Sequence, residues 1–480
     1  MNKSESHHSP TITSYGAVGG LVTGSCHIYE SRDSRINVDF GLFQGKLEER
    51  DQNDKSRNLQ DIGPMVRGSS EILLTHTHID HIGRLPLVFK AGFRPTVYAD
   101  KRTVKFMEPM LMDSAKIQMR NDRKNPLYDY DDVEETLRHV KGVEPFCRIP
   151  VGQKHSKITA EFLPNGHVMG ACAILLRDKG ENTLFTGDIG KSDQLLCGGY
   201  DDFCNQYPED PIHNLVVEST CFRNEPINFE MRKREIINGI NQAFGGGGSV
   251  LIPVLSFSRS QEIREIIHNA MRSGEIINDA LVVIDAPLGE KITKVFREDL
   301  GDYLTLRYGD DDHFYKTKKE SLSRFDFENM LVVGSHQESI ETDKMISRRK
   351  KVIIIASGGM LENGRSVNYF KGLFCQNTRN HILLTCHQVE GTKGAKLLSN
   401  PESVEEIKAK VVALKGNSSH ATGPEEIKGF IDKFNIRGAK TVLIGHGNEQ
   451  SRKSFAADLE FGKLLEAEII LPRIGQAIAI

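Results

Sequence analysis

The sequence predicts an α/β fold of layered sheets, on the strength of three observations. The chain has 480 residues, which is too long for one ordinary core and predicts two or three domains. Short apolar runs recur along the chain, and each is bounded by turn-forming residues. Stretches with helical periodicity separate these runs, so strands alternate with helices.

The composition is that of a globular chain without a strong charge imbalance. It has 62 basic and 65 acidic side chains, a net charge of −3, and an apolar fraction of 38%. These values exclude a disordered or fibrous class. Positive charge for nucleic-acid binding would have to be local, as in the basic run 348–351. The eight cysteines form no Cys-x-x-Cys pair, which argues against a zinc ribbon and favours free thiols in a reducing compartment.

The sequence shows no targeting or membrane-spanning segment. Residues 1–10 are polar and lack the apolar stretch of a signal peptide. The longest apolar runs, such as 352–356, are too short to cross a bilayer. We therefore expect a cytoplasmic protein that does not bind membranes.

Strand and helix signals follow one another in order. The predicted strands are 36–40, 71–74, 172–176, 183–185, 214–217, 249–254, 280–284, 330–333, 352–355, 381–384, 408–414 and 441–444. The clearest predicted helices are 227–243, 260–271, 424–433 and 451–459. Candidate linkers near 218–228 and 374–380 bound a segment that is itself α/β. That segment has the character of an insertion, because strands and polar motifs resume after it.

The segment 73–81 carries the strongest functional signal. It has the sequence Leu-Leu-Thr-His-Thr-His-Ile-Asp-His, so four ligand-type side chains follow an apolar strand within six residues. His76 and His78 can project to one side of an extended loop, whereas Asp80 and His81 can point to a neighbouring place. Imidazole and carboxylate ligands without a thiolate suit zinc, with manganese or iron as alternatives. The pattern predicts two metal ions.

This segment resembles the His-x-His-x-Asp-His signature of the metallo-β-lactamase superfamily, and later residues follow that family's motif order. Asp39 is similar to the first motif, for which the resemblance implies an acceptor that orients the ligand loop. His167 is similar to the third motif. Asp188 is similar to the fourth, and the resemblance implies that it bridges both ions.

The resemblance narrows to the β-CASP branch, which includes nucleases. Glu218 is similar to motif A of that branch, His420 to motif C, and His446 to a C-terminal His-Gly element. Motif B lacks its histidine, and Lys396 stands near that place. The segments 251–262, 356–361 and 390–392 are similar to landmarks of the inserted domain.

The resemblance implies a metallo-β-lactamase αββα sandwich with an inserted β-CASP α/β domain. The expected parts are an N-terminal part at 1–218, the insertion at 219–375, and a C-terminal part at 376–480 that includes an RNA-specificity segment. The inserted domain is expected to close over the metal site and to favour a single strand.

The resemblance also implies roles for individual residues. The metal ligands would be His76, His78 and His167 for one ion and Asp80, His81 and His420 for the other, with Asp188 shared. The catalytic residues would be Asp80, Asp39, Glu218 and His446. The candidates for binding the nucleic-acid backbone are Arg259, Ser357 and Lys396, with packing or solvent exposure as the alternative explanation for each.

The leading functional prediction is a zinc-dependent ribonuclease that cuts single-stranded RNA internally, with 5′ exonuclease activity as an addition. Its main support is His420, because DNA-directed relatives tend to carry valine at that place. A homodimer is implied by the resemblance alone. A DNA nuclease of the same branch is the second prediction. The inserted domain argues against a small-molecule hydrolase, and the full ligand set argues against a binding module without catalysis.

Overall fold

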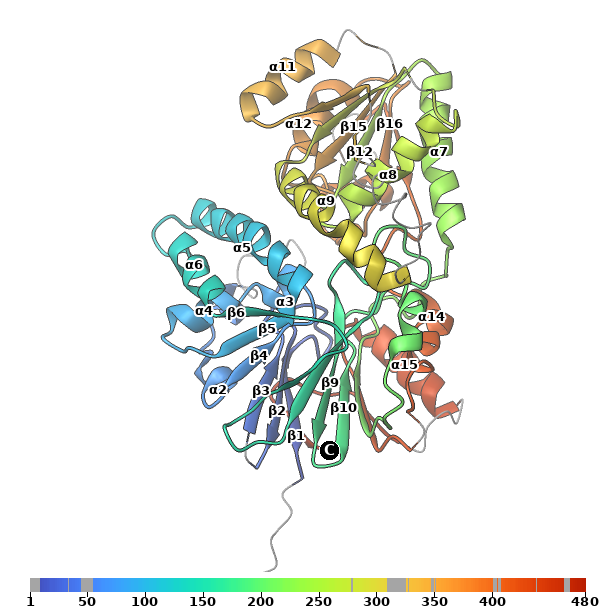
Figure 1. Ribbon diagram of the computed structural model, residues 1–480. Coiled ribbons are helices and arrows are strands. Elements are labelled where there is room, and N and C mark those ends of the chain that lie inside the picture. Colours follow the sequence, from blue (N-terminus) through green and yellow to red (C-terminus); the bar gives the residue numbers. More distant parts are fainter. Residues whose placement is uncertain are drawn as a thin grey trace, which may run out of the picture. The chain divides into compact units, whose positions relative to one another are not determined.

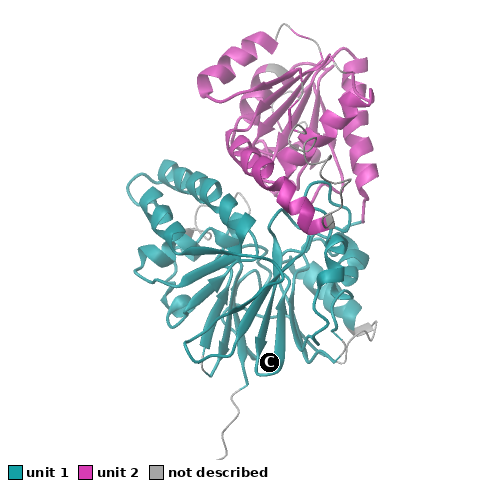
Figure 2. Cartoon of the chain, in the orientation of Figure 1, with its two compact units in different colours: residues 1–45, 49–225, 419–480 teal, residues 46–48, 226–418 magenta. Residues whose placement is uncertain are grey.

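The computed structural model describes residues 9–32, 34–44, 55–277, 279–308, 325–326, 328–346, 349, 351–399, 404, 407–436, 438–461 and 467–480. The chain forms two compact units (Figure 2). Unit 1 comprises residues 1–45, 49–225 and 419–480, and unit 2 comprises 46–48 and 226–418. Unit 2 is thus an insertion in the chain of unit 1.

Unit 1 contains two seven-stranded sheets, counted over the described residues. The first has the order β20 (Ala477–Ala479), β1 (Thr11–Gly16), β2 (Cys26–Ser31), β3 (Ser34–Val38), β4 (Glu71–Leu73), β5 (Thr96–Asp100) and β6 (Val140–Val143). The second has the order β19 (Glu468–Ile470), β18 (Thr441–Ile444), β11 (Asn214–Val217), β10 (Glu181–Phe185), β9 (Cys172–Asp178), β8 (Thr159–Pro164) and β7 (Arg148–Pro150).

The core of unit 1 lies between these two sheets. Strand β1 alternates buried and half-buried residues, as expected for a strand with one face on a core. Its Ile12 belongs to one apolar cluster with Leu73 of the first sheet and with Phe162 and Ile174 of the second. The cluster joins the sheets face to face, which is the layer architecture of a sandwich.

Helices flank both sheets of unit 1 (Figure 1). Those between strands of the first sheet are α1 (Lys55–Asn58), α2 (Gly63–Val66), α3 (Ile79–Ile82), α4 (Leu85–Lys90), α5 (Lys101–Asn121) and α6 (Tyr130–Arg138). Two short 3-10 turns, η2 (Tyr200–Asp202) and η3 (Cys204–Gln206), precede β11, and the C-terminal helices are α14 (Gly423–Ile431) and α15 (Glu449–Phe461). The described helices and sheets confirm the predicted metallo-β-lactamase architecture.

Unit 2 is built on a six-stranded parallel sheet. Its order is β14 (Met330–Val332), β13 (Leu281–Asp285), β15 (Val352–Ser357), β12 (Val250–Val254), β16 (His381–Leu384) and β17 (Lys410–Ala413). All residues of β12 and β16 are buried, as expected for central strands of a parallel sheet. The described helices are α7 (Phe229–Gly245), α8 (Arg259–Arg272), α9 (Pro287–Tyr308), α11 (His336–Ile346), α12 (Ser366–Tyr369), η4 (Phe370–Phe374) and α13 (Lys393–Ser399).

The end of unit 2 differs from the boundary expected from the sequence. The insertion was expected to end at residue 375, but unit 2 continues to Ser418. The reason is strand pairing, because β16 hydrogen-bonds to β12 and β17 hydrogen-bonds to β16. Apolar runs in the sequence predicted strands at the positions of β16 and β17, but such runs do not indicate which sheet a strand joins.

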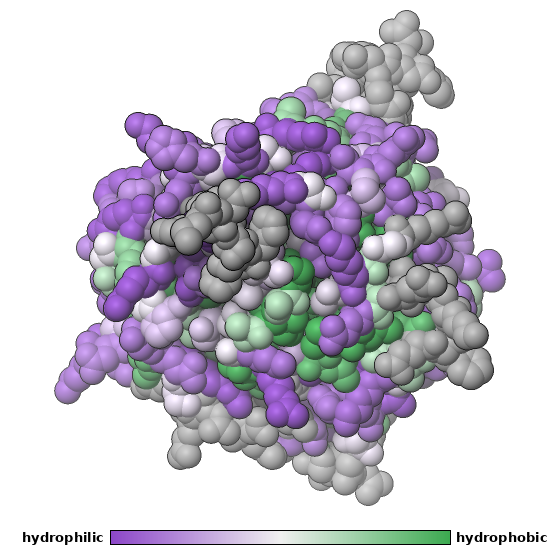
Figure 3. Space-filling view, turned by 90° about the horizontal axis from the view of Figure 1, so that it is seen from below, coloured by the Kyte–Doolittle hydropathy of each residue, from purple (hydrophilic) through white to green (hydrophobic). Residues whose placement is uncertain are grey.

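The hydropathy of the described helices bears on membrane insertion. No described helix is long and apolar enough to cross a membrane. Figure 3 views the molecule from below, and hydrophilic residues cover most of that face around a central hydrophobic area.

Candidate metal centre

The candidate site forms where strands of unit 1 end. Strands β3 and β4 are parallel neighbours in the first sheet, and β10, β11 and β18 are parallel neighbours in the second. Parallel neighbours bring their carboxyl ends to one edge of a sheet. The polar residues that follow these five strands are Asp39, the histidines of the 76–81 segment, Asp188, Glu218 and His446. His167 comes from the loop between β8 and β9.

The ligand loop, which runs from the end of β4 through α3, is held by its backbone. Ser25 N donates to Asp80 O at 2.8 Å, and Phe40 N donates to His81 O at 2.7 Å. The loop lies so close to residue 41 that a Cβ there would be 1.5 Å from Asp80 O. Gly41 is therefore required for the approach of the two segments.

Asp39 orients this loop with its side chain. Its Oδ1 accepts a hydrogen bond from Thr75 N at 2.8 Å, and its Oδ2 accepts one from His81 Nδ1 at 2.7 Å. Bonding at Nδ1 leaves the Nε2 lone pair of His81 for a metal ion. The backbone of Asp39 has φ +61°, a left-handed conformation that costs energy in a non-glycine residue. Asp39 thus makes the hydrogen bonds that an orienting acceptor would make, and its role stays a prediction.

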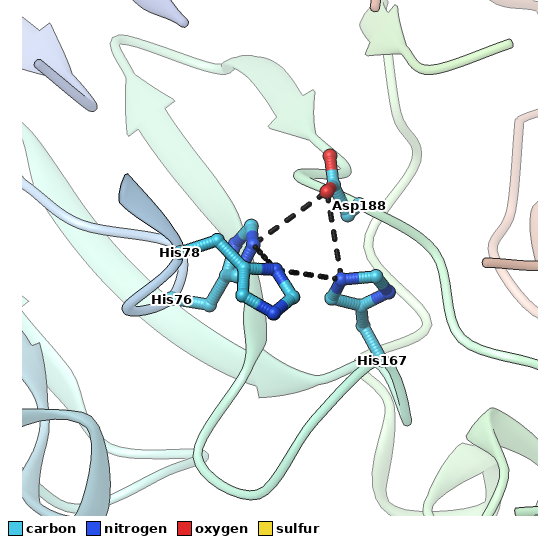
Figure 4. A group of neighbouring side chains, drawn as sticks. All are labelled: His76, His78, His167 and Asp188. Carbon is cyan, nitrogen blue, oxygen red and sulfur yellow. Dashed lines mark hydrogen bonds and ion pairs between the residues drawn. The ribbon is translucent and has the colours of Figure 1, made fainter. Parts of the chain in front are cut away.

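The first ligand group contains His76, His78, His167 and Asp188 (Figure 4). The Nδ1 atom of His78 lies 2.9 Å from His76 Nε2 and 3.2 Å from His167 Nε2. Asp188 Oδ2 lies 3.5 Å from the Nε2 atoms of both His76 and His167. Ligands bound to zinc at about 2.0–2.1 Å lie roughly 3.4 Å apart in a tetrahedron, so these separations fit one ion.

The second ligand group contains Asp80, His81 and His446. His446 Nε2 lies 3.1 Å from His81 Nε2 and 3.5 Å from Asp80 Oδ2. Burial acts to raise the pKa of Asp80, but the hydrogen bond from His446 and the charge of His81 lower it to about 2. The carboxylate is therefore ionised and able to bind a cation at neutral pH.

Asp188 belongs to both groups. Its Oδ2 faces the first group, and its Oδ1 lies 3.2 Å from His81 Nε2 and 3.3 Å from His446 Nε2. Oδ1 is buried and has no hydrogen-bond partner among the described residues. Because a buried carboxylate oxygen needs a partner, this atom fits a bound cation. The donor set therefore fits two metal ions with Asp188 between them.

The pKa values differ between the two groups. Burial lowers the pKa of His78 to about 4, and it holds those of His76 and His167 well below their usual value. These rings are neutral at pH 7, as metal ligands must be. Burial also acts against protonation of His81, but the Asp188 and Asp39 carboxylates raise its pKa well above the usual value. Metal binding at His81 must therefore displace a proton.

Glu218 and His420 form a pair next to the metal groups, and Glu218 also clusters with Asp188 and His446. His420 Nδ1 lies 3.0 Å from Glu218 Oε1 and 3.1 Å from Oε2. Ile189 N donates to Oε1 and Thr220 N to Oε2, which fixes the carboxylate. Burial acts to lower the pKa of His420, but the Glu218 and Asp188 charges raise it to about 10. His420 therefore carries a proton at pH 7.

The structure exchanges two histidines relative to the sequence expectation. His420 was expected beside Asp80 and His81, but His446 occupies that place. His446 follows β18, which pairs with β11, and Thr220 Oγ1 lies 2.7 Å from its Nδ1. His420 follows no strand and is placed by an isolated bridge to Gly190. The pairing of β18 with β11 therefore determines which histidine joins the second ligand group, and the local sequence around each histidine does not.

The three backbone-binding candidates lie in unit 2. Arg259 is buried and forms an ion pair with Glu262, so its charge is already compensated. Ser357 is half-buried at the end of β15, and Lys396 is exposed on α13. Exposure leaves Lys396 available to an anion, whereas the burial of Arg259 favours the packing explanation.

Two family models match the chain. Residues 19–220 match the metallo-beta-lactamase superfamily, and residues 260–397 match the Beta-Casp domain. The match to the first covers the residues of the first metal group, and the second lies within unit 2.

Relatives and a solved structure extend over almost the whole chain. This chain is 28% identical over 474 residues to "Ribonuclease TTHA0252" of Thermus thermophilus, and the match covers 96% of this chain and 97% of that protein. It is 26% identical to "Transcription termination factor FttA" of Cenarchaeum symbiosum, covering 98% of this chain and 70% of that protein. A protein of unknown function from Enterococcus faecalis has the same fold, with a TM-score of 0.56, 14% identity, and coverage of 98% of this chain and 100% of that one.

Proposed function

We propose that this chain, which belongs to the metallo-β-lactamase superfamily and carries its β-CASP domain, is a two-metal ribonuclease that cuts single-stranded RNA internally. The single observation that carries the proposal is the position of Asp188, which offers one carboxylate oxygen to each ligand group. Such an arrangement suits hydrolysis of a phosphodiester. A relative named as a ribonuclease, matched over nearly its full length, supports RNA as the substrate.

The first metal is assigned to His76, His78, His167 and Asp188, and the second to Asp80, His81, His446 and Asp188. Zinc suits these imidazole and carboxylate donors, with manganese or iron as alternatives. Bound ions would activate a water molecule and neutralise charge on the phosphate. Asp39 holds His81 in the required tautomer by accepting a hydrogen bond from its Nδ1.

His420 is the proposed proton donor to the leaving oxygen. It is protonated at neutral pH, because its pKa is about 10, and its side chain remains 17% exposed. Its Nε2 lies 3.7 Å from Asp188 Oδ2, so the ring edge faces the metal groups. Glu218 holds the ring through Nδ1 and keeps it charged. General acid catalysis of this kind contributes about 10²–10⁴-fold in rate.

The test uses end-labelled single-stranded RNA and DNA of the same sequence, each with and without a chelator. The double variant Asp80→Ala plus His81→Ala should lose cleavage. The control variant Glu135→Ala plus His139→Ala removes an ion pair between α6 and its C-cap residue, and it should retain cleavage. Cutting of DNA in preference to RNA would favour a DNA nuclease. A protein that holds two metal ions and cuts neither strand would contradict the proposal. Dimerisation and cytoplasmic location stay predictions.

A further inference from the structure

Unit 2 contains a cavity of about 210 Å³ that the metal centre does not use. It is lined by the residues that precede three strands, namely Ser249 before β12, Arg349 before β15, and Asn380 before β16. These strands are parallel neighbours, so the three segments share the amino edge of the sheet. Arg349 belongs to the basic run 348–351, of which Arg348 and Lys350 lie outside the described residues.

The cavity combines an apolar wall with a cationic rim. The wall includes Ile346, Ile354 and Phe374, which are buried. The rim carries Arg349 and Arg379, both exposed. No carboxylate lines the cavity, and neither guanidinium forms an ion pair with a carboxylate of the described residues. The two positive charges are therefore available to an anion.

The walls of the cavity are tied to one another. Ser249 N donates to Asn380 Oδ1 at 2.9 Å, and Val352 N donates to Ser249 Oγ at 3.1 Å. The loop at Gly248 lies against the next wall so closely that a Cβ there would be 1.8 Å from Arg379 O. These contacts fix the three segments before any ligand arrives, which reduces the entropic cost of binding.

We propose that this cavity binds a nucleotide, with Arg349 and Arg379 contacting its phosphate and the apolar wall contacting its base. Guanidinium groups bind phosphate oxygens in a bidentate manner, and bases pack on apolar or aromatic surfaces. A free mononucleotide and one nucleotide of a strand share this chemistry.

The test is calorimetric titration of the full-length protein with AMP, adenosine and inorganic phosphate, with a chelator present to prevent cleavage. Arg349→Gln and Arg379→Gln should each weaken AMP binding about tenfold, the usual effect of losing one charge-assisted hydrogen bond. Lysine at either position should restore part of the affinity. Arg272→Gln, an exposed change on α8, should leave binding unchanged.

The double variant carries both Arg349→Gln and Arg379→Gln. If it folds and binds AMP as well as the unchanged chain does, the proposal is overturned. Phosphate binding as tight as AMP binding would overturn the role of the apolar wall. A tetranucleotide that binds more tightly than AMP and loses this affinity in the double variant identifies a strand as the source. Equal affinities for AMP and the tetranucleotide identify the free nucleotide as the source. Because no cleavage is measured, the result is independent of the proposed ribonuclease activity.

Discussion

Glu218 binds His420 through both of its carboxylate oxygens, which lie 3.0 and 3.1 Å from Nδ1 of the imidazole. This contact occupies Nδ1. Burial acts to lower the pKa of His420, but the Glu218 and Asp188 charges raise it to about 10. His420 is therefore protonated at neutral pH beside the ligand groups, which is why we propose it as the proton donor.

The two C-terminal histidines should respond differently to removal. His446→Ala should lower the metal content from about two ions per chain to about one, because His446 lies with Asp80 and His81. His420→Ala should keep both ions but slow RNA cleavage by about 10²–10⁴-fold. Plasma mass spectrometry and single-turnover kinetics on the same samples measure both effects. Loss of one ion in His420→Ala, with both ions kept in His446→Ala, would instead support His420 as the ligand, as expected from the sequence.

Glu218→Gln should change the pH dependence of cleavage. The Glu218 charge raises the pKa of His420, so its removal should lower that pKa by about one unit or more. A donor must be protonated, and the alkaline limb of the pH–rate profile should therefore move to lower pH. The profile of Ser192→Ala, a nearby hydroxyl outside the pair, serves as the control. An unchanged alkaline limb would exclude His420 as the titrating donor.

Asp39→Asn should weaken metal binding without removing a ligand. The amide cannot replace the charged acceptor at 2.7 Å from His81 Nδ1, and such changes usually cost about 10–100-fold in metal affinity. Ser25→Ala removes a longer contact to the same carboxylate, at 3.2 Å, and should have a smaller effect. Competition with a chromogenic chelator measures both affinities. Equal losses in the two variants would argue against the orienting role of Asp39.

Zinc binding at pH 7 should release protons. The pKa of His81 is raised well above its usual value, so the metal-free ring is protonated and must become neutral to bind. Apparent zinc affinity should therefore increase as the pH rises from 6 to 8. Calorimetry in two buffers that differ in ionisation enthalpy counts the protons. The same heat in both buffers would mean that His81 is already neutral.

Gly41→Ala should destabilise unit 1 and loosen the ligand loop. The new methyl group would lie 1.5 Å from Asp80 O, and forced shifts of this kind cost about 1–3 kcal/mol. Gly245→Ala at the end of α7 meets no atom within 4 Å and should leave stability unchanged or slightly higher. Scanning calorimetry with and without zinc compares the two variants. A Gly41→Ala protein as stable as the unchanged chain would show that the loop can shift freely.

Much of the fold followed from local sequence. Buried strands such as β12 and β15 are continuous apolar runs, and their predicted bounds agree with the structure to within two residues. Strand β1 was not predicted, because its sequence Thr-Ile-Thr-Ser-Tyr-Gly contains a single aliphatic residue and so forms no apolar run. The end of unit 2 was misplaced, since the pairing of β16 with β12 joins residues far apart in sequence.

The candidate metal centre was predictable where its proposed ligands are close in sequence. His76, His78, Asp80 and His81 lie in one segment of six residues, so their pattern is visible in the sequence. The choice between His420 and His446 depends on the parallel pairing of β18 with β11, which no local pattern encodes. Thr75 and Thr220 were missed as supporting residues, because a hydroxyl beside a ligand has no sequence signature.

The most direct test of two-metal RNA hydrolysis is a zinc titration of metal-free protein, with cleavage of single-stranded RNA measured at each addition. Sharing of Asp188 between two ions predicts no cleavage without metal and full cleavage at about two equivalents per chain. Full cleavage in the presence of a chelator, or none with two ions bound, would contradict it.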